Sequence, residues 1–252
     1  MESTDVQRCC GMTEVLLFFL LFALSSCHFN KNNSNADNIN DLPPTVHKEE
    51  INALTLSDSI SCPIIKSEPK GSKQISVFDP FFKEYARQIN WDWRLLASIA
   101  YWESRFFTDR KSKAGAAGLM GLMPRTAKKF GLTIDEIYDP EKNIKAASEF
   151  IKSLNRTFGS IENEDERIRF ILAAYNSGVG HIFDAQALAK KFGKNPKKWK
   201  DVEEFLKLKN LPEYYDDPVC KFGYFRSTET ISFVQKVIAR WNYYLRIMNY
   251  EL

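Results

Sequence analysis

Histidine and cysteine are scarce in this sequence, with three histidines and five cysteines among 252 residues. His28 and His47 lie in a polar N-terminal segment and His181 stands alone downstream, so they form no cluster with the spacing of metal ligands. We therefore predict no structural or catalytic metal and no cofactor.

Hydrophobic runs long enough to cross a membrane are also missing. The run from Val15 to Leu24 has ten residues, whereas a membrane-spanning helix needs about 20. This length is typical of the hydrophobic region of a secretory signal, and the run ends in Leu-Ser-Ser-Cys, which resembles a bacterial lipobox. The sequence predicts a lipoprotein signal peptide over residues 1–26 and lipidation of Cys27. An uncleaved hydrophobic anchor is the alternative.

Apolar periodicity is absent from the next segment, which is polar and rich in asparagine. Because so few apolar side chains cannot bury a core, we expect residues 27–76 to form a flexible tether. With Cys27 lipidated, the cysteines left outside the cytoplasm are Cys62 in this tether and Cys220 near the C-terminus. These two either form a disulfide or remain separate thiols.

Alternating strand patterns and internal repeats are missing from the rest of the chain. From Val77 onward the pattern is helical, with proline or aspartate at helix starts and glycine at helix ends. The expected helices run from about 79 to 89, 92 to 104, 124 to 131, 140 to 159, 165 to 177, 181 to 192, 196 to 208 and 228 to 248, with a tyrosine-rich loop before the last. Residues 77–252 are therefore predicted to form one all-α domain of ordinary size.

Acidic residues are missing from 110 to 134, although the net charge of the chain is only +3. The basic residues that bracket the glycine-rich part of this stretch are Arg110, Lys111, Lys113, Arg125, Lys128 and Lys129. Such a surface suits an anionic polymer, with a solvated basic face as the alternative. The export signal disfavours nucleic acid, so we expect a negatively charged wall polymer or a membrane surface as partner.

Among the residues that are present, Glu103 is the most informative. It shares one helical face with Leu96, Ile99, Ala100 and Phe107, at the i, i+3, i+4, i+7 spacing, and its helical neighbours carry no positive charge. Apolar surroundings raise the pKa of a carboxyl group by desolvation, which suits a group that holds a proton near neutral pH and donates it. The sequence thus offers a candidate general acid, with a glutamate on the rim of a core helix as the alternative.

A second carboxylate is missing close to Glu103 in the sequence. Asp109 is the nearest that follows, and the next is Asp135. Glycosidases that work with two carboxylates need the second as nucleophile or as base for water. The sequence therefore favours a chemistry that uses one acid.

Four segments occur in a fixed order: WES (102–104), GAAGLMGLMP (115–124), LAAYNSG (172–178) and STETISFV (227–234). Together they resemble the lytic transglycosylases with a lysozyme-like catalytic domain, the soluble type, which share this fold with goose-type lysozyme. The stretch from HIFDAQALAKKFGKNP through PEYYDDPVCKFGY looks most like the membrane-bound murein transglycosylases of the F type. The resemblance covers roughly 77–250 and implies a single lysozyme-like catalytic domain.

The resemblance also implies an activity. In this family one glutamate, here Glu103, protonates the glycosidic oxygen between N-acetylmuramic acid and N-acetylglucosamine and then takes a proton from the sugar C6 hydroxyl. The product is a 1,6-anhydro-muramyl end in the peptidoglycan strand, and no water is consumed. The alternatives are a hydrolytic muramidase and a non-catalytic peptidoglycan-binding lipoprotein.

The same resemblance assigns substrate-binding residues. Ser104 is expected to orient the acid or the acetamido group, unless it is a plain helix-end serine. Tyr175 and Asn176 are expected near the acid and the N-acetyl group, with a core position as the alternative for Tyr175. Glu229 matches a family acid near the cleft, although a glutamate there would also favour the helix N-terminus.

The glycine-rich segment matches the family in part. Gly115, Gly118 and Gly121 let the backbone approach a ligand closely, and we expect Met120 and Met123 to form an adaptable apolar wall. The family commonly has glutamine where this chain has Gly121, and often has glutamine where Trp102 precedes the acid. A side-chain hydrogen bond to the sugar is therefore either missing here or supplied by a neighbour.

The location follows from the lipobox and the polar residues after it. No acidic residue directly follows Cys27 in HFNKNN, which resembles a periplasm-facing outer-membrane lipoprotein of a Gram-negative bacterium. The expected partners are peptidoglycan glycan strands and, through the lipid at Cys27, the membrane.

Overall fold

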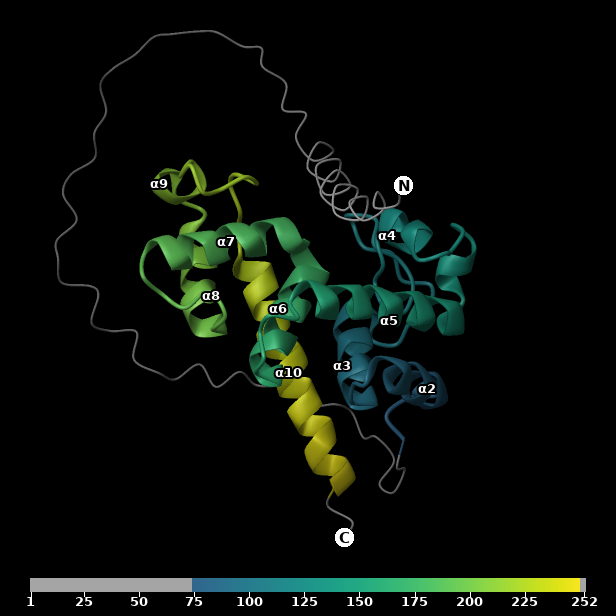
Figure 1. The fold of residues 1–252 in the computed structure, drawn as a ribbon. Coiled ribbons are helices and arrows are strands. Elements are labelled where there is room, and N and C mark those ends of the chain that lie inside the picture. Colours follow the sequence, from purple (N-terminus) through teal and green to yellow (C-terminus); the bar gives the residue numbers. More distant parts are fainter. Residues whose placement is uncertain (1–73, 250–252) are drawn as a thin grey trace, which may run out of the picture. The chain divides into compact units, whose positions relative to one another are not determined.

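The structure is a computed structural model that describes residues 74–249, all within one compact unit (Figure 1). Its helices are α2 (Asp79–Ile89), α3 (Trp93–Ser104), α4 (Pro124–Lys129), the 3-10 helix η1 (Glu136–Tyr138), α5 (Pro140–Thr157), α6 (Glu164–Ser177), α7 (Val179–Lys191), α8 (Trp199–Leu208), α9 (Pro212–Tyr215) and α10 (Thr228–Asn249). Within 74–249 the β structure amounts to isolated bridges in the glycine-rich segment, so the all-α prediction is confirmed. The predicted signal peptide, Cys27 and Cys62 lie outside the described residues.

The helix starts follow the capping residues of the sequence. The side chain of Asp92 accepts a hydrogen bond from the backbone N–H of Arg94 (2.8 Å), and Asp139 caps α5 in the same way. Backbone N–H groups of Ile75 and Ser76 donate to the carboxylate of Asp79. The folded part therefore includes Ile75, two residues before the expected start.

Three expectations about helix bounds need correction. The helix of Glu103 ends at Ser104 as predicted, but Phe107 therefore lies beyond it and is 62% exposed instead of sharing its buried face. The helix expected from 196 begins at Trp199, because Pro196 belongs to a turn in which its carbonyl accepts a hydrogen bond from Gln186. The tyrosine-rich loop contains the short helix α9.

The core places the C-terminal end of α3 next to α10. Helix α3 packs against both α2 and α10, while α6 contacts α5, α7 and α10. Leu96, Ile99 and Ala100 are fully buried on the inner face of α3. In Figure 1 α10 runs past α3 and α6, which brings sequence from 227 onward to the turn that carries Glu103.

A buried ion pair fixes the segment that leads into α10. The ammonium of Lys209 lies 2.5 Å from the carboxylate of Asp184, and both side chains are almost fully buried. The same carboxylate accepts hydrogen bonds from the backbone N–H groups of Lys221 and Phe222. The phenyl ring of Phe222 lies against Gly180, where a Cβ atom would fall 2.6 Å from the ring. These contacts set the approach of the chain to the start of α10.

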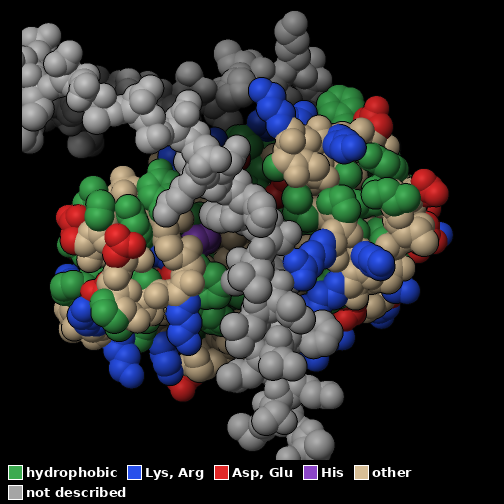
Figure 2. Space-filling view, turned by 90° about the horizontal axis from the view of Figure 1, so that it is seen from above, with side chains coloured by type: hydrophobic (Ala, Val, Ile, Leu, Met, Phe, Trp, Pro, Cys, Tyr) green, Lys and Arg blue, Asp and Glu red, His purple; other side chains and the backbone are tan. Residues whose placement is uncertain are grey.

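The surface carries basic groups in the stretch that lacks acidic residues. All six basic residues of residues 110–129 are exposed. On the face shown in Figure 2, Lys and Arg side chains lie in small groups among hydrophobic ones. Within residues 74–249 no helix is both long and apolar enough to cross a membrane.

Candidate active site

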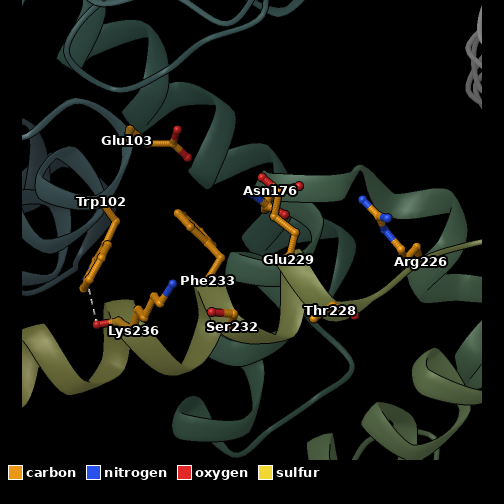
Figure 3. Close-up of a pocket in the computed structure, with 9 residues that line it drawn as sticks. All are labelled: Trp102, Glu103, Asn176, Arg226, Thr228, Glu229, Ser232, Phe233 and Lys236. Carbon is orange, nitrogen blue, oxygen red and sulfur yellow. Dashed lines mark hydrogen bonds between the residues drawn. The ribbon is translucent and has the colours of Figure 1, made fainter. Parts of the chain in front are cut away.

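A pocket of about 510 Å³ lies where α3, α6 and α10 meet (Figure 3). Its lining residues are Trp102, Glu103, Asn176, Arg226, Thr228, Glu229, Ser232, Phe233 and Lys236. Three of the four sequence segments thus meet at this pocket. The fourth, the glycine-rich segment, lies behind Glu103.

Glu103 occupies the last turn of α3 and its side chain is half-buried. Burial raises the pKa of its carboxyl group to about 8, the negative charge of Glu229 adds to this rise, and Arg110 opposes it. Within 74–249 the carboxyl group accepts no hydrogen bond that would stabilise its charged form. The raised pKa expected from desolvation is confirmed, so at neutral pH this group holds a proton that it can donate.

Gly121 lies directly against the carboxyl group of Glu103. Its φ of +61° is in the left-handed region, and a Cβ atom there would fall 2.3 Å from Oε2 of Glu103. In this backbone conformation the space that a glutamine side chain would use is filled by Glu103 itself. The absence of a side chain at Gly121 therefore leaves room for the Glu103 carboxyl group. Residue 121 makes no side-chain contact with a sugar.

The turn that contains Gly121 is held by Asn143 of α5, a residue that the sequence analysis missed. The Asn143 amide accepts a hydrogen bond from the Met120 N–H (2.7 Å) and donates one to the Ile137 carbonyl (2.8 Å). Asn143 is fully buried. Its spacing from Ala147 and Ile151, on the apolar face of α5, could have predicted this burial from the sequence. A buried asparagine on such a face needs partners for its amide, and these fix the turn.

The two methionines of the glycine-rich segment differ in burial. Met120 is fully buried, because its side chain packs in the core while its backbone is held on both sides. Met123 is 44% exposed and precedes α4, outside the lining of the pocket. The expectation of an adaptable methionine wall is therefore wrong for Met120.

Tyr175 and Asn176 take different positions at the end of α6. The Tyr175 hydroxyl donates a hydrogen bond to the Met120 carbonyl (2.6 Å), and its ring packs against Phe150. Burial, followed by the charge of Glu103, raises the pKa of Tyr175 well above its usual value. Asn176 is exposed in the pocket, and its amide oxygen accepts a hydrogen bond from Thr230 (2.8 Å). Its N–H groups are left as donors toward a ligand.

Ser104 and Glu229 differ in their access to the pocket. The Ser104 hydroxyl is fully buried and donates to the Ala100 carbonyl (3.1 Å), as a helix-end serine does. Glu229 lies in the pocket and raises the pKa of Glu103 by its charge. The second carboxylate that the sequence lacks near Glu103 is therefore brought in by α10, whereas Asp109 is exposed and outside the lining.

Other lining residues of α10 were also missed. Ser232, Phe233 and Lys236 follow Glu229 at i+3, i+4 and i+7, the spacing of one helical face. That spacing could have been read from the sequence once Glu229 was assigned to a cleft. The indole N–H of Trp102 donates to the backbone carbonyl of Lys236 (2.9 Å), which ties α3 to α10 at the edge of the pocket.

Neither a metal site nor the disulfide partner is present in the described part. Residues 74–249 contain no group of three or more His, Cys, Asp or Glu side chains that could hold a metal ion. The thiol of Cys220 donates to the Tyr214 carbonyl (3.2 Å), and burial raises its pKa. Because Cys62 lies outside the described residues, the disulfide stays a prediction.

Comparisons with known proteins identify the family of this domain. Residues 80–198 match the family model "Transglycosylase SLT domain". Two relatives, both named "Membrane-bound lytic murein transglycosylase F", are 34% identical over 165 residues in Desulfosudis oleivorans and 38% identical over 178 residues in Pasteurella multocida. These alignments cover 66% and 69% of this chain but 36% and 35% of the relatives.

Among solved structures, the 70 kDa soluble lytic transglycosylase SLT70 of Escherichia coli matches with a TM-score of 0.49 and 25% identity, over 68% of this chain and 24% of that one. The chain thus spans about a third of the length of the curated relatives it matches. Glu103 and Tyr175 fall inside the region of the family model, whereas α10 follows it. Residues 80–198 of this chain therefore belong to the transglycosylase SLT family.

Proposed function

We propose that this chain is a lytic transglycosylase that cleaves the β-1,4 bond between N-acetylmuramic acid and N-acetylglucosamine in peptidoglycan. The carrying observation is the carboxyl group of Glu103, which faces a pocket built from the family's segments and keeps its proton at neutral pH. The names of the relatives, which act on murein, supply the substrate class.

The reaction needs two proton transfers at one carboxyl group. Glu103 donates its proton to the glycosidic oxygen as the bond from that oxygen to C1 breaks, and the substrate's own N-acetyl group stabilises the developing cation. The carboxylate left behind then takes the proton of the C6 hydroxyl, whose oxygen bonds to C1 and closes the 1,6-anhydro ring. We expect the N–H groups of Asn176, which lines the pocket, to hold the acetamido carbonyl. Tyr175 donates to the Met120 carbonyl and so holds the turn behind the acid.

Hydrolysis is the second candidate, because Glu229 brings another carboxylate into the pocket. A carboxylate at that place could serve as base for a water molecule, as in two-carboxylate glycosidases. Digestion of purified sacculi in ¹⁸O-labelled water separates the two reactions. Transglycosylation leaves the released ends unlabelled and lighter by one water, whereas hydrolysis puts ¹⁸O on C1 of the reducing end.

The pH dependence of the reaction follows from the pKa of Glu103. The rate should be steady near neutral pH and fall as the pH rises through about 8, because the acid then loses the proton that it must donate. Replacing Glu229 by glutamine removes a negative charge that raises this pKa, so the falling limb should move to lower pH in Glu229→Gln. Initial rates of release of soluble fragments from sacculi, measured at constant ionic strength, check both.

The Glu229→Gln variant also distinguishes the two reactions. If Glu229 only tunes Glu103, the variant keeps most of its activity below neutral pH. If Glu229→Gln is inactive at every pH and the parent protein incorporates ¹⁸O, the protein is a hydrolase in which Glu229 acts as the base, and the proposed transglycosylase reaction is wrong.

For the location, we propose that Cys27 is lipidated and holds the domain at the periplasmic face of the outer membrane. The short hydrophobic run that ends in Leu-Ser-Ser-Cys supports this, as do relatives named membrane-bound. Cys27→Ala should move the protein from the membrane pellet to the soluble fraction of lysed cells. A variant that still pellets with membranes would point to an uncleaved hydrophobic anchor.

A further inference from the structure

Lys236 is held at the edge of the pocket by Trp102. Its exposed ammonium group lies 5.2 Å from the centroid of the indole ring, within the range of a cation–π contact. The indole N–H also donates to the backbone carbonyl of the same lysine (2.9 Å). Trp102 thus fixes both the backbone and the charge of Lys236, and in Figure 3 that charge lies between Trp102 and Phe233.

A second cation sits on the same indole. The guanidinium carbon of Arg105 lies 4.2 Å from the centroid of Trp102 and 4.1 Å from that of Tyr101. Arg105 and Phe106 are consecutive non-glycine residues in the left-handed region (φ 59° and 66°), a conformation that costs about 1 to 3 kcal/mol at each. These two residues follow the end of α3, and their conformation turns Arg105 back over Tyr101 and Trp102.

These two cations have no acidic partner in the described part of the chain. Between residues 74 and 249, no carboxylate lies within 4.0 Å of the charged nitrogens of Arg105 or Lys236. The nearest acid on the same face of α10 is Glu229, seven residues away, which is about 10 Å along a helix axis. An anion that enters this end of the pocket therefore meets positive charge without competition from a neighbouring carboxylate.

We propose that Lys236, positioned by Trp102, binds a carboxylate of the muramoyl residue and so makes the pocket prefer muramic acid strands over neutral N-acetylglucosamine polymers. This rests on the proposed function, because it places a glycan along α10 with its scissile bond at Glu103. N-acetylmuramic acid differs from N-acetylglucosamine by a lactyl ether, whose carboxyl group is either free or linked to a stem peptide with carboxylates of its own. Both sources present the same chemistry to an ammonium group.

The test measures binding apart from catalysis. In the catalytically silent Glu103→Gln background, affinities are measured by calorimetry for peptide-bearing glycan strands, for strands stripped of peptide by an amidase, and for chitohexaose. Lys236→Gln should weaken binding of carboxylate-bearing strands about tenfold and leave chitohexaose unchanged. Lys200→Gln, which removes an exposed charge on α8 away from the pocket, should change none of the three.

Trp102 is tested as a positioning residue. Trp102→Leu removes the ring and the N–H while keeping Lys236, so it should reduce the preference for carboxylate-bearing strands, and Trp102→Phe should restore part of it by keeping an aromatic face. The ratio of the affinities for carboxylate-bearing strands and chitohexaose reports this role, because a general loss of structure would lower both affinities together.

The outcomes distinguish the lactyl carboxylate from the stem-peptide carboxylates, and they test the role of Lys236 separately from the proposed transglycosylase activity. A loss with stripped strands alone assigns the lactyl carboxylate, and a loss with peptide-bearing strands alone assigns the stem peptide. A loss with both kinds of strand means that Lys236 binds either carboxylate. No loss with either strand, or an equal loss with chitohexaose, overturns the role of Lys236. Turnover of sacculi by the chain with Glu103 intact is assayed in parallel. Absence of any cleavage there would refute the proposed function even if the binding preference depends on Lys236.

Discussion

Glu103→Gln should lower the release of fragments from sacculi by at least about a thousandfold while the protein stays folded and still binds glycan. The amide keeps the shape of the side chain but has no acidic proton to give, and it cannot take the proton of the C6 hydroxyl. Asp109→Asn is the matched control, because Asp109 is exposed and outside the pocket, so its activity should remain within about twofold of the parent. Loss of activity in Asp109→Asn with retention in Glu103→Gln would refute the assignment of the acid.

The same variant should change the pH dependence of stability. The folded state raises the pKa of Glu103 from 4.5 to about 8, so between these values the folded state binds more protons than the unfolded state. The free energy of unfolding of the parent should therefore fall as the pH rises through this window, and Glu103→Gln should lose less over the same window. Thermal unfolding of both proteins at pH 5 and pH 9 measures the difference.

Gly121→Ala should impair both stability and activity. The added methyl group would sit 2.3 Å from the Glu103 carboxylate, and φ of +61° is unfavourable for any residue with a Cβ atom. We expect the free energy of unfolding to fall by about 1 to 3 kcal/mol and the rate on sacculi to fall about a hundredfold, because displacement of a positioned acid is costly for catalysis.

Gly131→Ala is the control for backbone strain alone. Gly131 also has a positive φ (+87°), but a Cβ atom there meets nothing within 4 Å. It should destabilise the protein without slowing the reaction. An equal loss of activity in both alanine variants would show that Gly121 acts through overall stability and has no specific role behind the acid.

Local signals in the sequence sufficed to predict the helices and the all-α class. Proline and aspartate at helix starts, exemplified by Asp92 and Asp139, set bounds that the structure reproduces within a few residues. The direction of the pKa shift of Glu103 was also predictable, because burial is its largest cause and apolar helical neighbours indicate burial. The helix starts depend on interactions between residues that are near in sequence, whereas the burial of Glu103 also involves distant segments such as Gly121.

The parts of the site that could not be predicted depend on approach between distant segments. The family resemblance led us to expect Glu229 near the cleft, but not its effect on the pKa of Glu103, which lies 126 positions away in the sequence and is reached through the packing of α10 on α3 and α6. Gly121 could be identified as a departure from the family pattern, but its role required the distance to the Glu103 carboxyl group. Met120 was misplaced because sequence spacing does not tell which side of a turn faces the core.

A direct titration of Glu103 tests the central claim, that one carboxyl group stays protonated at neutral pH. The side-chain carboxyl carbons of protein labelled with ¹³C-glutamate are followed by NMR as the pH is raised, and the Glu103→Gln variant assigns the signal. Glu103 as proton donor predicts a midpoint near 8. A midpoint close to the ordinary value of 4.5 would mean that the group is ionised at neutral pH and would contradict its role as the acid.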